Sequence, residues 1–97
     1  MVGEIMDSVI KEINQFFQTL NFNKVVINDY ENFEYKGKYY KLTKAGFNYY
    51  LECALSLDEA QKNLHEDVEP YSAKLYPPEK LKEIIKNDIM KFIVNGY

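Results

Sequence analysis

The spacing of the hydrophobic residues changes twice along this 97-residue chain, and this change constrains the fold more than any other feature. Between residues 3 and 20, apolar side chains recur every three or four positions, which is the period of a helix with one buried stripe. From residue 24 the period becomes two, as in strands, and from residue 78 the helical period returns. Helices at both ends of a run of strands predict an α+β domain.

The alternating middle segment predicts an antiparallel meander of three strands, with residues 24–28 as a further edge strand. Residues 33–42 indicate a hairpin that turns at Gly37, and a second turn over 44–46 leads into a strand over 47–55. One face of that last strand is apolar, which is typical of an antiparallel sheet covered on one side only. The apolar face consists of Phe47, Tyr49, Leu51, Cys53 and Leu55, and the other face of Asn48, Tyr50, Glu52 and Ala54.

The last part of the chain predicts two helices joined by a loop. Ser56 is a good N-terminal cap for a short helix over 58–65. Pro77 and Pro78 are tolerated in the first turn of a closing helix, because amide hydrogens there lack partners in any case. Between these helices, the segment 67–76 (DVEPYSAKLY) is interpreted as a polar loop.

The two terminal helices each need a sheet face to cover, so the chain is expected to form a two-layer α+β sandwich in the order α-β-β-β(-β)-α-α. The length is enough for one domain, residues 1–97, and too short for two. A composition of 46% hydrophobic and 28% charged residues indicates a globular protein.

Several features favour a cytoplasmic protein. The single cysteine, Cys53, cannot form an internal disulfide, which is typical of a reducing compartment. Glu4 and Asp7 lie where a secretory signal would carry positive charge, so no export signal is expected. The chain also lacks an apolar run near the ~20 residues that a membrane span requires, so no membrane association is expected.

The charge composition disfavours a nucleic-acid partner. All twelve basic residues are lysines, so the chain has no guanidinium group to bind guanine edges or phosphates with two parallel hydrogen bonds. The net charge of −3 also removes the general attraction to a polyanion. We therefore expect no nucleic-acid binding.

The segment LHEDVEPY contains the only histidine, His65, beside acidic residues. A histidine with an orienting carboxylate could act as a general acid–base group. However, adjacent residues at a helix end point in different directions, and a histidine there also has a structural use, since its charged form complements the helix dipole. We therefore expect no catalytic role for His65.

Metal-binding and enzyme motifs are not found. A zinc site needs three or four ligands at characteristic spacings, which one histidine and one cysteine do not provide. The spacing and the loop glycine of a calcium-binding loop are missing. Phosphate-loop, dinucleotide and nucleophile-elbow motifs are also missing, and the thiol of Cys53 is expected to be buried and inert. The sequence therefore predicts a protein without cofactor, metal or enzymatic activity.

The acidic residues are concentrated in one segment. Residues 57–76 contain five carboxylates against two lysines, so this fifth of the chain carries the whole net charge of −3. Such a patch can steer a basic partner and raise its association rate. The alternative interpretation is an ordinary solvated helix face followed by a polar loop.

Nine tyrosines form a second unusual feature, with adjacent pairs at 39–40 and 49–50. In a strand, one member of each pair faces the helices and the other faces outward, which places Tyr50 beside Glu52 on the outer face. Outward tyrosines are effective interface anchors, because they are large, stiff and able to form hydrogen bonds. The alternative is that tyrosine simply suits strands.

The segment 50–71 resembles small immunity proteins of bacterial polymorphic-toxin and contact-dependent inhibition systems. In such families a strand ending in an LE-x-A-like segment precedes a helix with an EA motif and an acidic ED-x-x-x-Y loop. Here these correspond to 51–54 (LECA), 58–60 (DEA) and 66–71 (EDVEPY), followed by a closing helix rich in lysine and isoleucine. The resemblance covers about half the chain, its motifs are short, and the N-terminal helix lies outside it.

The resemblance implies a cytoplasmic bacterial protein that binds a cognate toxin domain, such as a nuclease, and blocks its active site. Carboxylates of the inhibitor could then stand in for the phosphates that a basic active site attracts. The alternative is a non-enzymatic regulatory or interaction module, with a homodimer as one form of it. The residues expected to bind the partner are Tyr50, Glu52, Glu66, Asp67, Glu69 and Tyr71.

Overall fold

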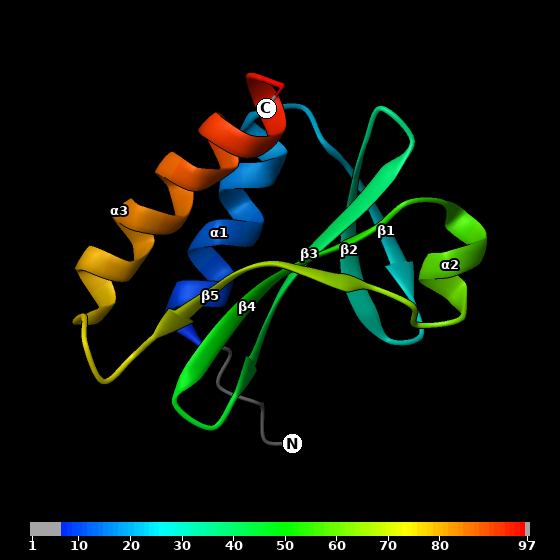
Figure 1. The fold of residues 1–97 in the computed structure, drawn as a ribbon. Coiled ribbons are helices and arrows are strands. Elements are labelled where there is room, and N and C mark those ends of the chain that lie inside the picture. Colours follow the sequence, from blue (N-terminus) through cyan, green and yellow to red (C-terminus); the bar gives the residue numbers. More distant parts are fainter. Residues whose placement is uncertain (1–6, 97) are drawn as a thin grey trace, which may run out of the picture.

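The computed structural model describes residues 7–96, which form two layers (Figure 1). Two helices, α1 and α3, lie side by side on one face of a five-stranded sheet, in which every strand is antiparallel to its neighbour and the spatial order β1-β2-β3-β4-β5 follows the chain. The predicted α+β class and two-layer meander are confirmed. The elements are α1 (Ser8–Thr19), β1 (Asn23–Ile27), β2 (Tyr30–Tyr35), β3 (Lys38–Ala45), β4 (Asn48–Ala54), α2 (Leu57–Gln61), β5 (Glu66–Ser72), α3 (Pro78–Asp88) and the π-helical turn η1 (Ile89–Val94).

Helix α1 begins at an effective cap. The side chain of Asp7 accepts hydrogen bonds from the backbone amides of Val9 and Ile10 at 2.8 and 3.2 Å, which satisfies two donors that have no partner inside the helix. The Asp7 carboxylate also accepts a 2.7 Å hydrogen bond from Tyr49 of β4, so the cap is tied to the sheet. The predicted helical residues 3–6 lie outside the described residues.

The core lies between the helices and the sheet and is centred on Phe17. Its ring centroid lies 5.0 Å from those of both Phe22 and Phe33, and these three side chains are buried. From α3, Leu81 and Ile85 close the same core. The helical stripes predicted from the sequence therefore meet on one sheet face.

The hairpin turns are short and require positive φ angles. At the predicted turn, Lys36 and Gly37 have φ angles of 53° and 84°, and Asn28 and Asp29 between β1 and β2 have φ angles of 53° and 69°. Two successive residues of this conformation match the right-handed twist of the strands that they connect. The turn at Gly37 is confirmed.

The predicted loop over 67–76 is wrong in its first part, because Glu66–Ser72 form β5, an edge strand paired with β4, and only residues 73–76 connect β5 to α3 without regular structure. Pro70 suggested a loop, but an edge strand accepts proline wherever its missing amide would face solvent. The same proline makes this edge a poor template for a further strand, since it removes a donor. Any contact made along this edge therefore depends on side chains.

The second face of the sheet, the one away from α1 and α3, is only partly open. Ala54 of β4 is fully buried there against Ala60 of α2, so this short helix covers one end of the second face (Figure 1). The predicted helix over 58–65 is shorter, and the predicted strand over 47–55 loses both end residues. Phe47 and Leu55, expected on the buried face, are exposed.

Candidate functional site

The residues predicted to bind a partner lie on two neighbouring strands, and the pairing of β4 with β5 divides them between the two faces. Glu52 lies opposite Asp67 and Tyr50 lies opposite Pro70, so these residues share the second face. The register shifts next to Glu52, between Leu51 and Glu52. Glu66 and Asp67 are exposed, whereas Tyr50 and Glu52 are half-buried. Glu66 lies opposite Cys53, which packs against the helix-side core, so Glu66 does not share the second face. We define the acidic edge as Tyr50, Glu52, Glu66 and Asp67, the residues of β4 and β5 beside the free edge of the sheet.

Glu69 and Tyr71 face the helices instead. Glu69 lies opposite the buried Leu51, and Tyr71 lies opposite Tyr49. Tyr71 is buried, and its hydroxyl donates a 2.7 Å hydrogen bond to Asp88 of α3. Burial and the Asp88 carboxylate raise the pKa of Tyr71 far above its ordinary value, so the hydroxyl keeps its proton. Tyr71 joins β5 to α3 in the structure, and its hydroxyl is already engaged.

The carboxylates of β5 are not neutralised by neighbouring lysines. Within residues 7–96, no lysine forms an ion pair with Glu66, Asp67 or Glu69, although ion pairs involve most acidic residues of α1 and α3. Burial of Glu52 and the nearby Asp67 charge raise the pKa of Glu52, despite an attraction to Lys41 at 3.9 Å. The negative charge of β5 is therefore available to an external cation.

A polar cluster beside the acidic edge was not anticipated from the sequence. Lys41 of β3 is buried on the second face, with its ammonium 3.3 Å from the side-chain oxygen of Asn63 and 4.8 Å from the ring centre of Tyr30. Alternation in β3 does predict that Lys41 faces away from the helices, but α2 and the chain after it cover this position. Asn32 of β2 is buried on the same face.

His65 belongs to this cluster and has no carboxylate partner among residues 7–96. Its Nε2 lies 2.9 Å from Oδ1 of Asn32, and its Nδ1 is buried with no hydrogen-bond partner in the described part of the chain. Burial, with a contribution from the Lys41 charge, lowers the pKa of His65. Because α2 ends at Gln61, the expected contact of His65 with a helix C-terminus is wrong.

We expect the protein to lose stability as the pH falls below about 6.5, the ordinary pKa of histidine. The unfolded chain then binds a proton at His65 that the folded chain, with its lowered pKa, does not, so protonation favours unfolding. The stability is fully present above this pH and declines as the pH falls towards the folded pKa. Urea unfolding of the wild type and of His65→Gln between pH 7.5 and 5 measures this decline. Equal pH slopes for the two proteins would exclude it.

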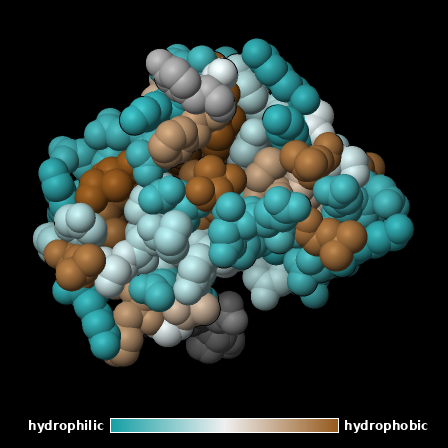
Figure 2. All heavy atoms as spheres, in the orientation of Figure 1, coloured by the Kyte–Doolittle hydropathy of each residue, from teal (hydrophilic) through white to brown (hydrophobic). Residues whose placement is uncertain are grey.

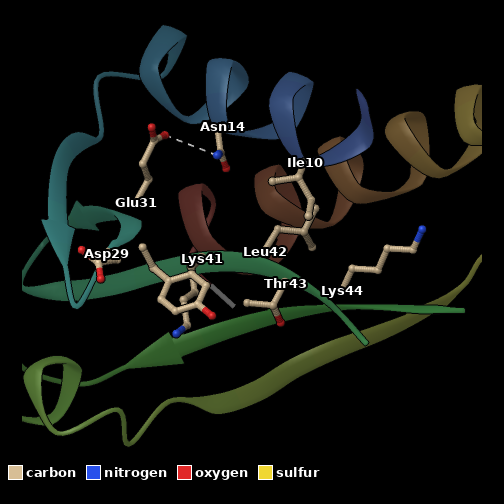
Figure 3. A pocket seen from close by; sticks show the side chains of 9 residues that line it. Ile10, Asn14, Asp29, Glu31, Lys41, Leu42, Thr43 and Lys44 are labelled. Atoms are coloured by element: carbon tan, nitrogen blue, oxygen red, sulfur yellow. Dashed lines mark hydrogen bonds between the residues drawn. The ribbon is translucent and has the colours of Figure 1, made fainter. Parts of the chain in front are cut away.

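A cleft of about 440 Å³ opens where β2 and β3 separate (Figure 3). The two strands pair only from Phe33 opposite Tyr40 to the turn, and beyond that point Asn14 reaches towards the cleft from α1 and forms a 3.4 Å hydrogen bond with Glu31. Both charge signs line the cleft, with Glu31 near Lys24 and Lys44 near Asp7. The cleft therefore offers no single-sign surface to a charged ligand.

Other kinds of site are not found among the described residues. In residues 7–96, no group of three or more histidine, cysteine or acidic side chains could hold a metal ion. Burial raises the pKa of the Cys53 thiol, which keeps it in the less reactive protonated form. No helix in this range is long and apolar enough to cross a membrane.

Comparison of the chain with protein-family models, with curated proteins and with solved structures gives no match.

Proposed function

We propose that this protein is a cytoplasmic immunity protein, which binds a cognate toxin domain and blocks the basic active site of that domain. The observation that carries the proposal is the unpaired negative charge of β5, where Glu66 and Asp67 are exposed and no described lysine neutralises them. Unpaired surface carboxylates attract a basic surface from a distance and accept hydrogen bonds from it on contact. A nuclease active site, which binds phosphates, is such a surface.

The acidic edge also has the stiffness that an inhibitor needs. Glu52 and Asp67 stand on paired strands, and Thr43 of β3 donates a 3.3 Å hydrogen bond to Glu52. The Asn48 side chain lies 3.3 Å from the hydroxyl of Tyr50, which orients that tyrosine on the second face. Side chains that are already ordered lose less conformational entropy on binding. In this proposal the protein performs no chemistry and acts by occupying the toxin.

The test is a protection assay. The C-terminal domain encoded by the neighbouring open reading frame is expressed in a bacterial host with and without this protein, and viable cells are counted. We expect the domain alone to kill and co-expression to restore growth. An equally acidic, unrelated small protein serves as the control for nonspecific neutralisation. A harmless neighbour, or killing that co-expression does not relieve, would refute the immunity function.

A second candidate function is a homodimeric interaction module, and the other edge of the sheet favours it. Strand β1 contains no proline, and Val26 on it is 64% exposed. An edge strand with an exposed apolar side chain can pair with the same edge of a second copy. Light scattering distinguishes the two candidates, because a monomer at micromolar concentration contradicts the dimer.

A further inference from the structure

A groove of about 360 Å³ runs between β5 and α3, on the helix side of the acidic edge. Glu69 and Pro70 line it from β5, Asp88 and Ile84 from α3, and Leu75 and Tyr76 from the connecting segment. Figure 2 shows hydrophobic atoms near the beginning of α3, where the chain arrives from β5. Leu75 is 74% exposed and Tyr76 39% exposed, so two large apolar side chains stand open beside two carboxylates.

The groove is held in shape by its own hydrogen bonds. The amides of Leu75 and Tyr76 bond to the carbonyl oxygen of Ser72 at 3.2 and 3.3 Å, and the amide of Ala73 bonds to the carbonyl oxygen of Phe47 at 2.7 Å. These bonds fix the connecting segment against the beginning of β4. The lining of the groove is therefore preorganised, so a partner group that binds there does not have to order this segment.

The carboxylates of the groove have capacity for an external donor. The hydroxyl of Tyr71 fixes Asp88 through one carboxylate oxygen, Oδ2, and no hydrogen bond from the described residues reaches the other oxygen. Glu69 has no ion-pair partner in residues 7–96. Two lysines close to the groove in sequence are engaged elsewhere, since the Lys74 ammonium lies 4.7 Å from the ring centre of Phe47 and Lys80 pairs with Glu83 at 2.9 Å.

We propose that this groove seats an arginine side chain of a partner protein. A guanidinium is planar and carries five donors, so it can stack on the ring of Tyr76 and donate to Glu69 and Asp88 together. Its aliphatic stem would lie along Leu75 and Ile84. This chain contains no arginine, so a second copy cannot supply the occupant and a different protein must. The identity of that protein as a toxin rests on the proposed function.

The probe for this groove is N-acetyl-arginine amide, titrated into the isotope-labelled protein and followed by amide chemical shifts in NMR spectra. The control ligand is N-acetyl-citrulline amide, which has the same length and no charge. We expect shifts centred on Leu75, Tyr76 and Asp88, with binding of the arginine amide about tenfold tighter than that of the citrulline amide, as charge-assisted hydrogen bonds imply. Equal binding of the two amides, or shifts that lie elsewhere, would overturn the proposal.

Two variants test whether the arginine amide binds in the groove or elsewhere on the surface. Glu69→Gln and Asp88→Asn remove one charge each, and an asparagine oxygen at 88 still accepts the hydrogen bond from Tyr71, so the fold should persist. Each variant should weaken the arginine amide severalfold, whereas Asp58→Asn on the exposed surface of α2, away from the groove, should leave binding unchanged. Unchanged binding in both groove variants would also overturn the proposal.

The protection assay and the titration fail independently. If the neighbouring toxin is neutralised and the titration shows no arginine preference, the immunity function stands and the arginine groove does not. If the arginine preference appears but the neighbour is not neutralised, the groove stands and its partner is a protein other than that toxin.

Discussion

Reversing both exposed charges of β5, in the variant Glu66→Lys with Asp67→Lys, is expected to slow association with the cognate toxin domain by about 10- to 100-fold at low salt, the range that electrostatic steering provides. The two carboxylates are exposed and form no ion pair with a described lysine, so the substitutions should change the field and not the fold. The salt dependence of the association rate should weaken as well. Surface plasmon resonance at several salt concentrations measures both effects.

The matched control is Glu79→Lys with Glu83→Lys on α3, which changes the net charge by the same amount at exposed positions away from β5. The Lys80–Glu83 pair that it breaks is on the surface and contributes little stability, and Lys82, whose side chain is only 12% exposed, keeps its ion pair with Glu12 at 3.4 Å. If the two double variants slow association equally, the total charge and not the acidic edge governs binding. If neither slows association, the carboxylates of β5 play no part in the encounter.

The fold was predictable from sequence where burial imposes a period. The stripes of α1 and α3 and the alternation in β4 each reflect a surface that is apolar on one side, so the layers follow from them. Strand β5 escaped prediction because an edge strand is constrained on one side only. Pro70 is acceptable there, and the carboxylates at 66 and 67 face solvent, so the alternation that marks a half-buried strand is lost.

The functional surface was less predictable, because it depends on contacts between distant segments. Asn32 and His65 are 33 positions apart in sequence, and no periodicity signals that their side chains meet. From the sequence, Lys41 would be expected to be solvated on its strand, whereas in the structure α2 and the residues after it cover it. Tyr71 reads as the end of a recognition loop, yet the pairing of β5 turns it towards α3. The charge of this segment was visible in the sequence, whereas its division between two sheet faces was not.

Asp67 and Glu69 are two positions apart on β5, but the register shift opposite Leu51 and Glu52 places Asp67 on one face of the sheet and Glu69 on the other. The acidic edge and the groove are therefore adjacent. A single partner surface that approaches the free edge of β5 could therefore contact both sites. Backbone pairing is disfavoured at Pro70, so recognition along this edge relies on side chains. This arrangement suits a partner that offers several cationic side chains, which is the character expected of a phosphate-binding active site.

Replacing the central aromatic residue of the core, in the variant Phe17→Ala, is expected to cost about 3–5 kcal/mol of folding free energy. Phe17 is fully buried, and its ring lies 5.0 Å from those of Phe22 and Phe33, so the substitution removes packing from both the sheet and the end of α1. A domain of this size has roughly 5–15 kcal/mol of stability in total. Urea unfolding should show a midpoint lower by about 2 M.

The neighbouring Phe16 provides the control, because it lies on the same helix, has the same volume and is only half-buried beside Lys86. Phe16→Ala should cost about 1 kcal/mol, the centre of the range for single substitutions, because Phe16 packs against the edge of the core but stays partly exposed. Since both variants lose the same aromatic ring from α1, a difference between them reports burial and not helix propensity. Equal losses would mean that the aromatic cluster of α1, β2 and β3 is not the centre of stability.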